Sequence, residues 1–318
     1  MTHPDLPQGS ITSRFSSWHV LGAGAIGGLW ALRMASAGIH VTLLTHDNTA
    51  APSRKLLLQD GSSTLEHTFK QASTESSGDI SCLLVTTKAG ITTTALAPLL
   101  PHLPTGAIVL LLQNGMGTED TLQAQRPDLC VLNAITTDGV FRRGKDDLVQ
   151  AGHGETWLGS MHRRDEENAR AIATTLSQTG WPVHFAPDIR LRRWQKLAMN
   201  CAINPLTARY HCRNGELLDK PEALATMLGI CTEVAAVMQA EGMNADSEAL
   251  FRLACEGAAK TAANISSMRA DVEAGRRTEI AFLNGYLLSR AVPHGIATPV
   301  NSTLCAEILA MSPPEKNR

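Results

Sequence analysis

The sequence has no block of like charge and no long apolar run, and these absences exclude several classes of protein. It contains 28 lysine and arginine residues and 30 aspartate and glutamate residues, and the two signs are mixed along the chain. Without a basic block or an acidic tail, we expect no nucleic-acid partner. The longest apolar runs, such as residues 107–112, are too short to cross a bilayer, so we expect no membrane association.

Signals for secretion and for metal binding are also missing. Residues 1–17 contain no apolar stretch, which predicts that no signal peptide is present. The seven cysteines are scattered, and no two of them have CxxC spacing. We therefore expect reduced thiols, a cytoplasmic location and no metal site.

The length and the spacing of apolar residues predict two domains. A chain of 318 residues is longer than one hydrophobic core usually serves. Residues 1–16 are rich in proline, serine and glycine, and we expect a flexible arm there. Over residues 17–187, short apolar runs alternate with a helical pattern, as in parallel βαβ units. Over residues 188–318, apolar residues recur at helical spacing, which predicts an all-α domain.

The same periodicity places individual elements. Strands are expected at residues 18–21, 39–44, 80–86, 107–112 and 131–135. Helices are expected at residues 25–38, 197–206, 223–239, 248–263 and 278–292.

A glycine-rich turn joins the first expected strand to the first expected helix. Residues 22–27 read GAGAIG and fit the pattern GxGxxG. The first glycine allows a tight turn, the second lets the backbone approach a diphosphate, and the third lets the helix pack close to the strand. Phosphates bind to the free N–H groups at a helix N-terminus. The position between strand and helix favours a Rossmann-type dinucleotide-binding domain over a plain strand–helix turn.

The end of the second strand normally distinguishes NAD from NADP. An acidic residue there binds the ribose hydroxyls of NAD, and a cation favours the 2′-phosphate of NADP. The sequence offers both kinds of residue, since His46 could meet a phosphate, with Arg54 or Lys55 assisting, and Asp47 could bind a ribose.

Two further polar signals follow buried strands. Lys88 ends the segment Thr86-Thr87-Lys88, and Asn114 lies in the segment QNGMG at residues 113–117. Ligands of open α/β sheets bind at the carboxyl ends of strands, so both residues are candidates for binding cofactor or substrate. The alternatives are a solvated loop lysine and an Asn-Gly turn.

The most informative segment is the expected helix that contains Lys196. Lys196, Asn200 and Asn204 are four residues apart and share one face of an otherwise apolar helix. Buried polar side chains need partners, so this polar file indicates a surface that faces substrate. The alternative is structural: Asn204 serves a break at Pro205, and Lys196 lies at an edge. Cys201 falls on another face and is expected to pack rather than to react.

A second polar set occurs nearer the C-terminus. Asn264, Ser267 and Asp271 precede the acid Glu279, which stands before an apolar run. Ser267 and Asp271 are spaced for one helical face. Glu279 could bind a hydroxyl, or it could simply be a favourable acid in the first turn of a helix.

Taken together, these motifs resemble the ketopantoate reductase (2-dehydropantoate 2-reductase) family over nearly the whole chain after residue 17. The matching motifs are GxGAIG at residues 22–27, the lysine at 88, QNGxG at 113–117, KLxxNxxxNPLTA at 196–208, NGEL at 214–217, SSMxxD at 266–271 and RTEIxxxNG at 277–285. The last three motifs are far more specific than the glycine turn.

The resemblance implies an activity and a set of roles. The reaction is NADPH-dependent reduction of ketopantoate to (R)-pantoate, a step towards pantothenate and coenzyme A. Lys196 is implied as the general acid, and Glu279 as a catalytic residue that holds cofactor or substrate hydroxyls. Implied substrate contacts come from Asn114, Asn200, Asn204, Asn214, Asn264 and Ser267. Implied cofactor contacts come from Gly22, Ala23, Gly24, Ala25, Ile26, Gly27, His46, Lys88, Asn114, Val140 and Glu279.

Other readings remain open at this point. The family commonly has arginine where this chain has His46, so NAD stays possible as the cofactor. A reductase of another branched 2-oxo acid would keep every motif, and a dinucleotide sensor without activity is a third reading. The sequence is compatible with a monomer or a homodimer.

Overall fold

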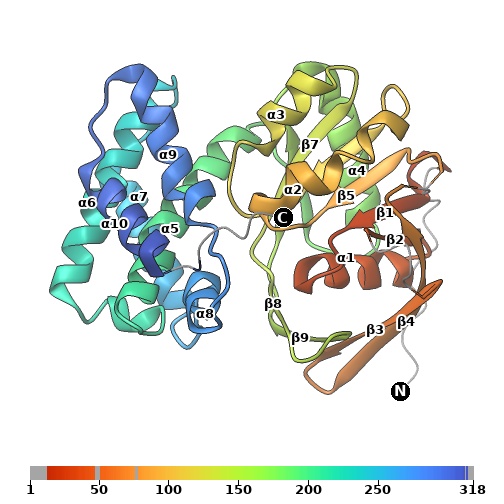
Figure 1. Cartoon of the computed structure of the whole chain (residues 1–318), viewed down its shortest axis with the longest axis horizontal. Helices are drawn as coiled ribbons and strands as arrows, with labels where there is room; N and C mark the ends of the chain where they lie inside the picture. Colours follow the sequence, from red (N-terminus) through yellow and green to blue (C-terminus); the bar gives the residue numbers. More distant parts are fainter. Residues whose placement is uncertain (1–12, 47–50, 76–77, 312, 314–318) are drawn as a thin grey trace. The chain divides into compact units, whose positions relative to one another are not determined.

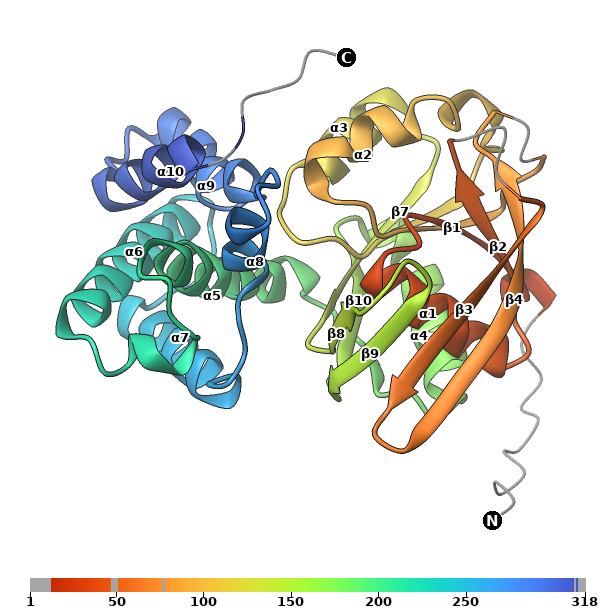
Figure 2. The same cartoon turned by 60° about the horizontal axis from the view of Figure 1, so that its bottom comes forward.

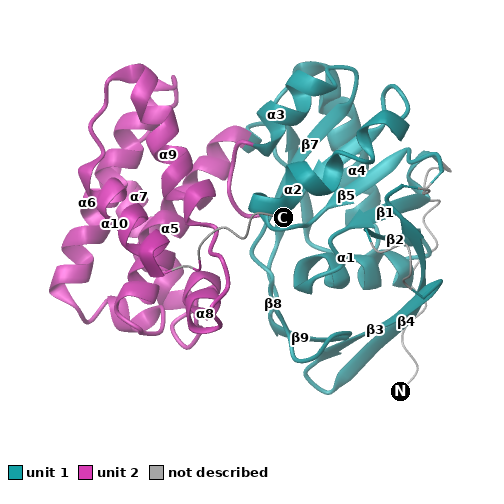
Figure 3. Cartoon of the chain, viewed as in Figure 1, with its two compact units in different colours: residues 1–113, 118–189 teal, residues 114–117, 190–318 magenta. Residues whose placement is uncertain are grey.

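The computed structural model describes residues 13–46, 51–75, 78–311 and 313, which form two compact units (Figure 3). The first unit comprises the described residues up to Gln113 together with Thr118–Ile189. The second comprises Asn114–Gly117 and the described residues from Arg190 onward. The sequence places the boundary between residues 187 and 188, close to this division, but gives no sign that residues 114–117 belong to the second unit.

The first unit is built on a sheet with a parallel centre (Figures 1 and 2). Six neighbouring strands run parallel, in the order β4-β2-β1-β5-β6-β7. Their bounds are Ser17–Leu21 (β1), His40–Thr45 (β2), Ser63–Ser73 (β4), Cys82–Val85 (β5), Ile108–Leu111 (β6) and Cys130–Thr136 (β7). From β1 the order proceeds to β2 on one side and to β5 on the other, which is the topological switch point of a doubly wound sheet.

Five more strands extend this centre at its two edges. At one edge β3 (Ser53–Asp60) pairs antiparallel with β4, β9 (Asp147–Gly152) follows β3, and β8 (Gly139–Arg142) follows β9. At the other edge lie β10 (Thr156–Ser160) and β11 (Val183–Phe185). The sequence did not predict these strands, because most of them lack the continuous apolar run of a strand that is buried on both faces.

Helices cover both faces of the parallel strands. One face packs against α1 (Ala25–Ser36) and α4 (Glu166–Ser177), and the other against α2 (Ala89–Leu96) and α3 (Thr118–Gln125). Alternate strand residues divide between the two layers, since Leu84 and Leu110 belong to the α1 side and Val85 and Leu111 to the α2 side. This alternation is the period-two pattern of a central strand.

The expectation of a flexible arm over residues 1–16 can be compared with the structure only at residues 13–16. Residues 1–12 lie outside the described part of the chain, but Ser13–Phe15 forms a 3-10 turn. Phe15 is buried, and its carbonyl oxygen accepts a hydrogen bond from the Trp18 indole N–H at 3.1 Å. Packing of an aromatic side chain therefore fixes the last residues of the expected arm, and that part of the prediction is wrong.

The second unit is helical apart from its turns. Its helices are α5 (Ile189–Arg209, whose first residue belongs to the sheet unit), α6 (Pro221–Ala240), α7 (Ser247–Lys260), α8 (Ser267–Glu273), α9 (Asn284–Ala291) and α10 (Pro299–Met311). By length and composition α6 could cross a membrane, but half of its most apolar stretch is buried inside the fold. Its buried face joins one apolar cluster with α5, α7 and α10.

The single helix expected at residues 278–292 is wrong. The chain forms a 3-10 turn at Ile280–Phe282 and changes direction at Leu283 (φ −109°, ψ −94°) before α9 begins. The turn is fixed from outside, because the Phe282 carbonyl accepts a hydrogen bond from the Met116 N–H at 3.1 Å. Apolar spacing cannot distinguish such a turn from a continuous helix.

Candidate active site

The glycine turn follows β1 and uses two of its three glycines for packing. Gly22 has a φ of 100°, and a Cβ on it would lie 2.7 Å from the Thr87 nitrogen. A Cβ on Gly27 would lie 2.3 Å from the Gly22 carbonyl oxygen. By contrast, a Cβ on Gly24 would meet nothing closer than that oxygen, at 3.9 Å. Packing alone does not require a glycine at position 24, which leaves room there for a ligand to approach the backbone.

The start of α1 supplies donors for an anion. Within the described residues, the backbone N–H groups of Ala25, Ile26 and Gly27 have no protein acceptor. The N-cap residue is Gly24, which has no side chain to satisfy them, and the first turn holds no acid. Free N–H groups and the helix dipole both favour negative charge here. These residues therefore fit the diphosphate of a dinucleotide.

Hydroxyl side chains join the loops after β1, β5 and β6. Thr86 Oγ1 donates to the Gly22 carbonyl oxygen at 2.6 Å. Thr87 and Thr92 share a hydrogen bond of 2.8 Å between their hydroxyl groups, and Thr92 donates onward to Gln113 Oε1 at 3.1 Å. Gln113 is the first residue of the QNGMG segment. These bonds fix the carboxyl ends of three adjacent strands, where the sequence predicts the cofactor.

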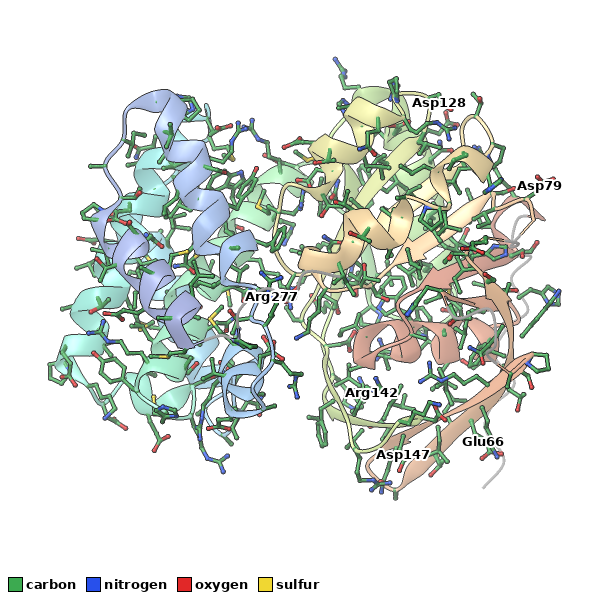
Figure 4. The ribbon with its side chains drawn as sticks, in the orientation of Figure 1. Glu66, Asp79, Asp128, Arg142, Asp147 and Arg277 are labelled. Carbon is green, nitrogen blue, oxygen red and sulfur yellow. The ribbon has the colours of Figure 1, made fainter. Side chains whose placement is uncertain are left out.

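The predicted cation Lys88 is exposed at the N-cap position of α2. His46 follows β2 and is also exposed, whereas Asp47 lies outside the described residues. Arg54 and Lys55, which were suggested to assist His46, each pair with an acid. Arg54 Nε donates to Asp146 at 2.6 Å, and Lys55 pairs with Glu66 at 2.9 Å. Figure 4 shows Glu66 on the hairpin formed by β3 and β4.

Val140, another predicted cofactor contact, lies in β8 and packs against the apolar cluster that includes α1. An ion pair holds the turn before it. Arg33 of α1 donates two hydrogen bonds to the Asp138 carboxylate, at 2.9 and 3.1 Å. The same carboxylate, only 1% exposed, also accepts from the Gly154 N–H. The β7–β8 turn is thus fixed to the helix that begins at the glycine turn.

In the second unit, α5 carries the predicted catalytic face. Lys196, Asn200 and Asn204 lie at successive turns of this helix and are each partly buried. Leu197, Ala198, Cys201 and Ala202, which lie between them, are fully or almost fully buried. The helix continues through Pro205 to Arg209, so the alternative in which Asn204 serves a break at the proline is wrong. Cys201 packs in the core as predicted, and burial raises the pKa of its thiol well above the ordinary value.

Burial lowers the pKa of Lys196 from 10.5 to about 8, and the negative charge of Glu279 opposes that shift. Glu279 stands at the N-cap position of the 3-10 turn Ile280–Phe282 and forms no side-chain cap. Glu279 therefore precedes a short 3-10 turn whose first turn holds no acid, instead of lying in the first turn of an α-helix, which was the alternative to a site residue. A lysine with this pKa is mostly protonated at neutral pH and gives up its proton more readily than a free lysine.

The remaining predicted substrate residues gather around the segment 261–267. The Asn214 N–H donates to the Asn264 carbonyl oxygen at 3.1 Å, and Asn214 Nδ2 donates to Thr261 at 2.8 Å. Asn214 is buried, whereas Asn264 and Ser267 are exposed. The structure thus brings Asn214 beside Asn264.

A buried pair of hydroxyl groups anchors the helix that begins at Ser267. Ser266 Oγ accepts from the Arg269 N–H at 3.1 Å and caps α8. It also shares a 2.6 Å hydrogen bond with Thr207, whose hydroxyl reaches the Asn204 carbonyl oxygen at 2.9 Å. The predicted residues Asn204 and Ser267 are therefore connected through Thr207 and Ser266.

The segment Asn114–Gly117 packs on the turn that follows Glu279. A Cβ on Gly115 would lie 2.8 Å from the Phe282 Cβ, and Gly117 faces the ring of Tyr286. Met116 is buried in the helical core. The predicted residue Asn114 is exposed at the start of this segment. Gly115 is therefore needed for close packing, Gly117 has a φ of 102° that favours glycine, and Asn114 lies near the turn of Glu279.

Several residues that build the site were not singled out from the sequence. Asp138 fixes the β7–β8 turn, Thr207 anchors α8, and the buried Asn284 amide donates to the Cys201 carbonyl oxygen. For Asn284 a signal did exist. A proline inside a helix leaves a carbonyl without its donor, so Pro205 implies a polar partner from elsewhere.

Comparisons with known proteins agree with these motifs. Residues 18–163 match the family described as "Ketopantoate reductase PanE/ApbA", and residues 188–312 match "Ketopantoate reductase PanE/ApbA C terminal". A 2-dehydropantoate 2-reductase from Vibrio cholerae is 40% identical over 291 residues, which is 91% of this chain and 95% of that protein.

Solved structures show the same fold. A PanE/ApbA family ketopantoate reductase from Ralstonia eutropha has a TM-score of 0.79 at 27% identity, covering 93% of this chain and 98% of that one. A D-mandelate dehydrogenase with NADH and anilino(oxo)acetate has a TM-score of 0.85 at 22% identity, with the same coverage, and shows the likeness of fold alone. From the family matches and the 40% identity, the chain belongs to the ketopantoate reductase family.

Proposed function

We propose that the protein reduces 2-dehydropantoate to (R)-pantoate with NADPH. The observation that carries this proposal is Lys196, a lysine with a pKa of about 8 on an apolar helix, with Asn200 and Asn204 on the same face and Glu279 nearby. The named activity of the Vibrio cholerae relative supports the choice of substrate. The product would feed pantothenate and coenzyme A biosynthesis in the cytoplasm, from a monomer or a homodimer.

The first unit would hold the cofactor. Free N–H groups at the start of α1 and the open side of Gly24 fit the diphosphate. His46, Lys88, Asn114, Val140 and Glu279 are proposed as further contacts, with His46 near the 2′-phosphate. When bound, the nicotinamide supplies the hydride, and the protein supplies orientation and charge.

The second unit would handle the proton. Addition of hydride to the keto carbon breaks the C=O π bond and places the electron pair on oxygen. The Lys196 ammonium would stabilise that oxygen and transfer its proton to it, giving a hydroxyl group and a neutral lysine. The lysine would then take a proton from solvent. Asn200, Asn204, Asn214, Asn264, Ser267 and Asn114 are proposed to bind the substrate.

The direct test is the loss of NADPH absorbance with 2-dehydropantoate, followed by the same assay with NADH. Rapid consumption of NADPH would support reaction, substrate and cofactor together. If the protein binds NADPH but turns over only another branched 2-oxo acid from a panel, the substrate is wrong and the reaction class stands. If it binds NADPH and turns over no 2-oxo acid, the protein is a sensor rather than an enzyme.

A further inference from the structure

Pro205 leaves a gap in the hydrogen bonding of α5. In a regular helix, the N–H at position 205 would donate to the carbonyl oxygen of Cys201, four residues earlier. Proline has no N–H, so this carbonyl lacks its helical donor. Cys201 is fully buried, so bulk solvent does not reach it to replace the missing donor. Instead, Asn284 Nδ2 lies 3.4 Å from the Cys201 carbonyl oxygen and donates to it.

A carboxylate fixes the orientation of the Asn284 amide through a second asparagine. Glu233 only accepts hydrogen bonds, and its oxygens accept from the Asn301 N–H at 3.0 Å and from Asn301 Nδ2 at 2.7 Å. Asn301 Oδ1 must therefore face the other way, where it accepts from Asn284 Nδ2 at 2.8 Å. The amide of Asn284 thus presents its NH₂ group both to Asn301 and to Cys201.

This arrangement is buried throughout. Asn284 and Asn301 are 0% exposed, and Glu233 is 9% exposed. Within the described residues, Asn284 Oδ1 has no hydrogen-bond partner. A buried carbonyl oxygen without a donor lowers the stability of the fold. Because Asn284 is present despite this cost, the hydrogen bonds of its NH₂ group must be important.

The hydrogen bond joins the two segments that carry the proposed catalytic pair. Cys201 directly follows Asn200 and lies five residues after Lys196 on α5. Asn284 lies five residues after Glu279 and begins α9. Between them, the Phe282 N–H donates to the Glu279 carbonyl oxygen at 2.9 Å, so the turn that connects Glu279 to Asn284 is itself ordered.

We propose that Asn284 is a positioning residue for the reduction, an inference that rests on the proposed function. Its amide replaces the hydrogen bond that Pro205 removes, and it thereby holds the segment of Glu279 at a fixed distance from the helix of Lys196. The interaction between two charges depends on their separation, so movement of this segment changes how strongly Glu279 favours the charged lysine.

The test uses Asn284→Leu, which keeps a similar volume and removes the donor. We expect kcat to fall roughly tenfold, because misplacement of reacting groups is costly. We also expect the alkaline midpoint of the kcat profile to move to lower pH. In the Glu279→Gln background, Asn284→Leu should cause no further movement of that midpoint. Gln239→Leu is the matched control, because the exposed Gln239 amide also donates to a backbone carbonyl, at 2.7 Å.

Combining Asn284→Leu with Pro205→Ala shows whether Asn284→Leu acts by displacing Glu279 or only by leaving the Cys201 carbonyl without a donor. In Pro205→Ala the new N–H donates to Cys201, so the double variant Pro205→Ala/Asn284→Leu has a satisfied carbonyl but no link to α9. We expect this double variant to melt at a higher temperature than Asn284→Leu, while keeping its lowered kcat and shifted midpoint. A return of the midpoint to the native value would overturn the proposal, because only the buried carbonyl would then matter.

The thermal comparison needs no substrate. If the native protein reduces no 2-oxo acid, the proposed function fails, but the melting temperatures still report whether Asn284 replaces the missing N–H. Equal effects of Asn284→Leu on the melting temperature in the native background and in the Pro205→Ala background would show that it does not.

Discussion

Thr86 Oγ1 lies 2.6 Å from the carbonyl oxygen of Gly22 and donates a hydrogen bond to it. A Cβ on Gly27 would lie 2.3 Å from both of these oxygen atoms. The hydroxyl group after β5 therefore occupies space that is available only because residue 27 is glycine. Since β1 and β5 adjoin at the switch point of the sheet, this contact shapes the place where such folds bind ligands.

Alanine substitutions at two glycines of the turn should have different effects. Gly27→Ala is expected to lower the free energy of unfolding by about 3 kcal/mol, because its methyl group overlaps backbone and hydroxyl oxygens. Gly24→Ala should leave the melting temperature nearly unchanged and weaken NADPH binding, because its methyl group enters open space beside the free N–H groups. Thermal melts and NADPH titrations distinguish the two. Tight NADPH binding by Gly24→Ala would contradict the proposed diphosphate position.

Removal of the lysine amine tests the proposed general acid. Lys196→Met should lower kcat by about 10²–10⁴-fold, with a much smaller effect on the dissociation constant for NADPH. Single-turnover kinetics with 2-dehydropantoate measure the chemical step directly. Lys220→Met serves as a control at a lysine outside the proposed site. A Lys196→Met rate within about threefold of the native rate would exclude the lysine as the acid.

The pH dependence follows from the pKa of Lys196. A general acid must be protonated, so kcat should be level below a pH of about 8 and should fall as the pH rises through that value. Because Glu279 raises this pKa, Glu279→Gln should move the midpoint to lower pH. Rate profiles of both proteins, measured in buffers of equal ionic strength, provide the comparison. A midpoint that moves upward in the variant would refute the assigned interaction.

His46 is proposed to meet the 2′-phosphate in place of the family's arginine. His46→Arg should tighten NADPH binding about tenfold, because a guanidinium is always charged and can bind phosphate with two parallel hydrogen bonds. NADH has no 2′-phosphate, so its binding should change little. Titration of the native and variant proteins with both cofactors tests this. Equal changes for the two cofactors would place His46 away from the 2′ position.

Both oxygens of the Glu233 side chain should be needed as acceptors in the helical unit. In the native protein the Val300 N–H donates to one Glu233 oxygen and the Asn301 N–H to the other. Glu233→Gln replaces one of these oxygens with an NH₂ group, so a donor then faces another donor. We expect a loss of about 1–3 kcal/mol in the free energy of unfolding. Urea denaturation measures it, with Glu256→Gln on the exposed face of α7 as the control. Equal stability of the two variants would show that the carboxylate is not needed.

Much of the parallel sheet could be predicted, because its strands are continuous apolar runs that are buried on both faces. The runs at 80–86 and 107–112 contain β5 and β6, and the run at 131–135 lies within β7. The five strands that extend this centre, and β4 at the end of the parallel set, could not be predicted in the same way. Strand β4, for example, is exposed along much of its length and is fixed by pairing with β2 and β3. Pairing with distant residues leaves little trace in local composition.

In the candidate site, too, features that depend on local spacing could be predicted, and features that depend on contacts between distant segments could not. Helical spacing alone places Lys196, Asn200 and Asn204 on one face of α5, and the structure agrees. The pairing of Cys201 with Asn284, by contrast, depends on how α5 and α9 pack, which no local pattern records. Apolar spacing also predicted a continuous helix across Leu283, which is wrong. A hydrogen bond from the Met116 N–H to the Phe282 carbonyl fixes a turn there instead.

The short segment Asn114–Gly117 limits how the chain can be divided. Met116 is a core residue of the helical unit, although most of the chain around it in sequence belongs to the sheet unit. A gene fragment that begins after residue 189 would encode the helices without one of their own core side chains. A fragment that ends there would display that methionine to solvent. Recombination at the linker alone would therefore damage both products, and the two halves of this protein can be exchanged between homologues only if residues 114–117 are exchanged as well.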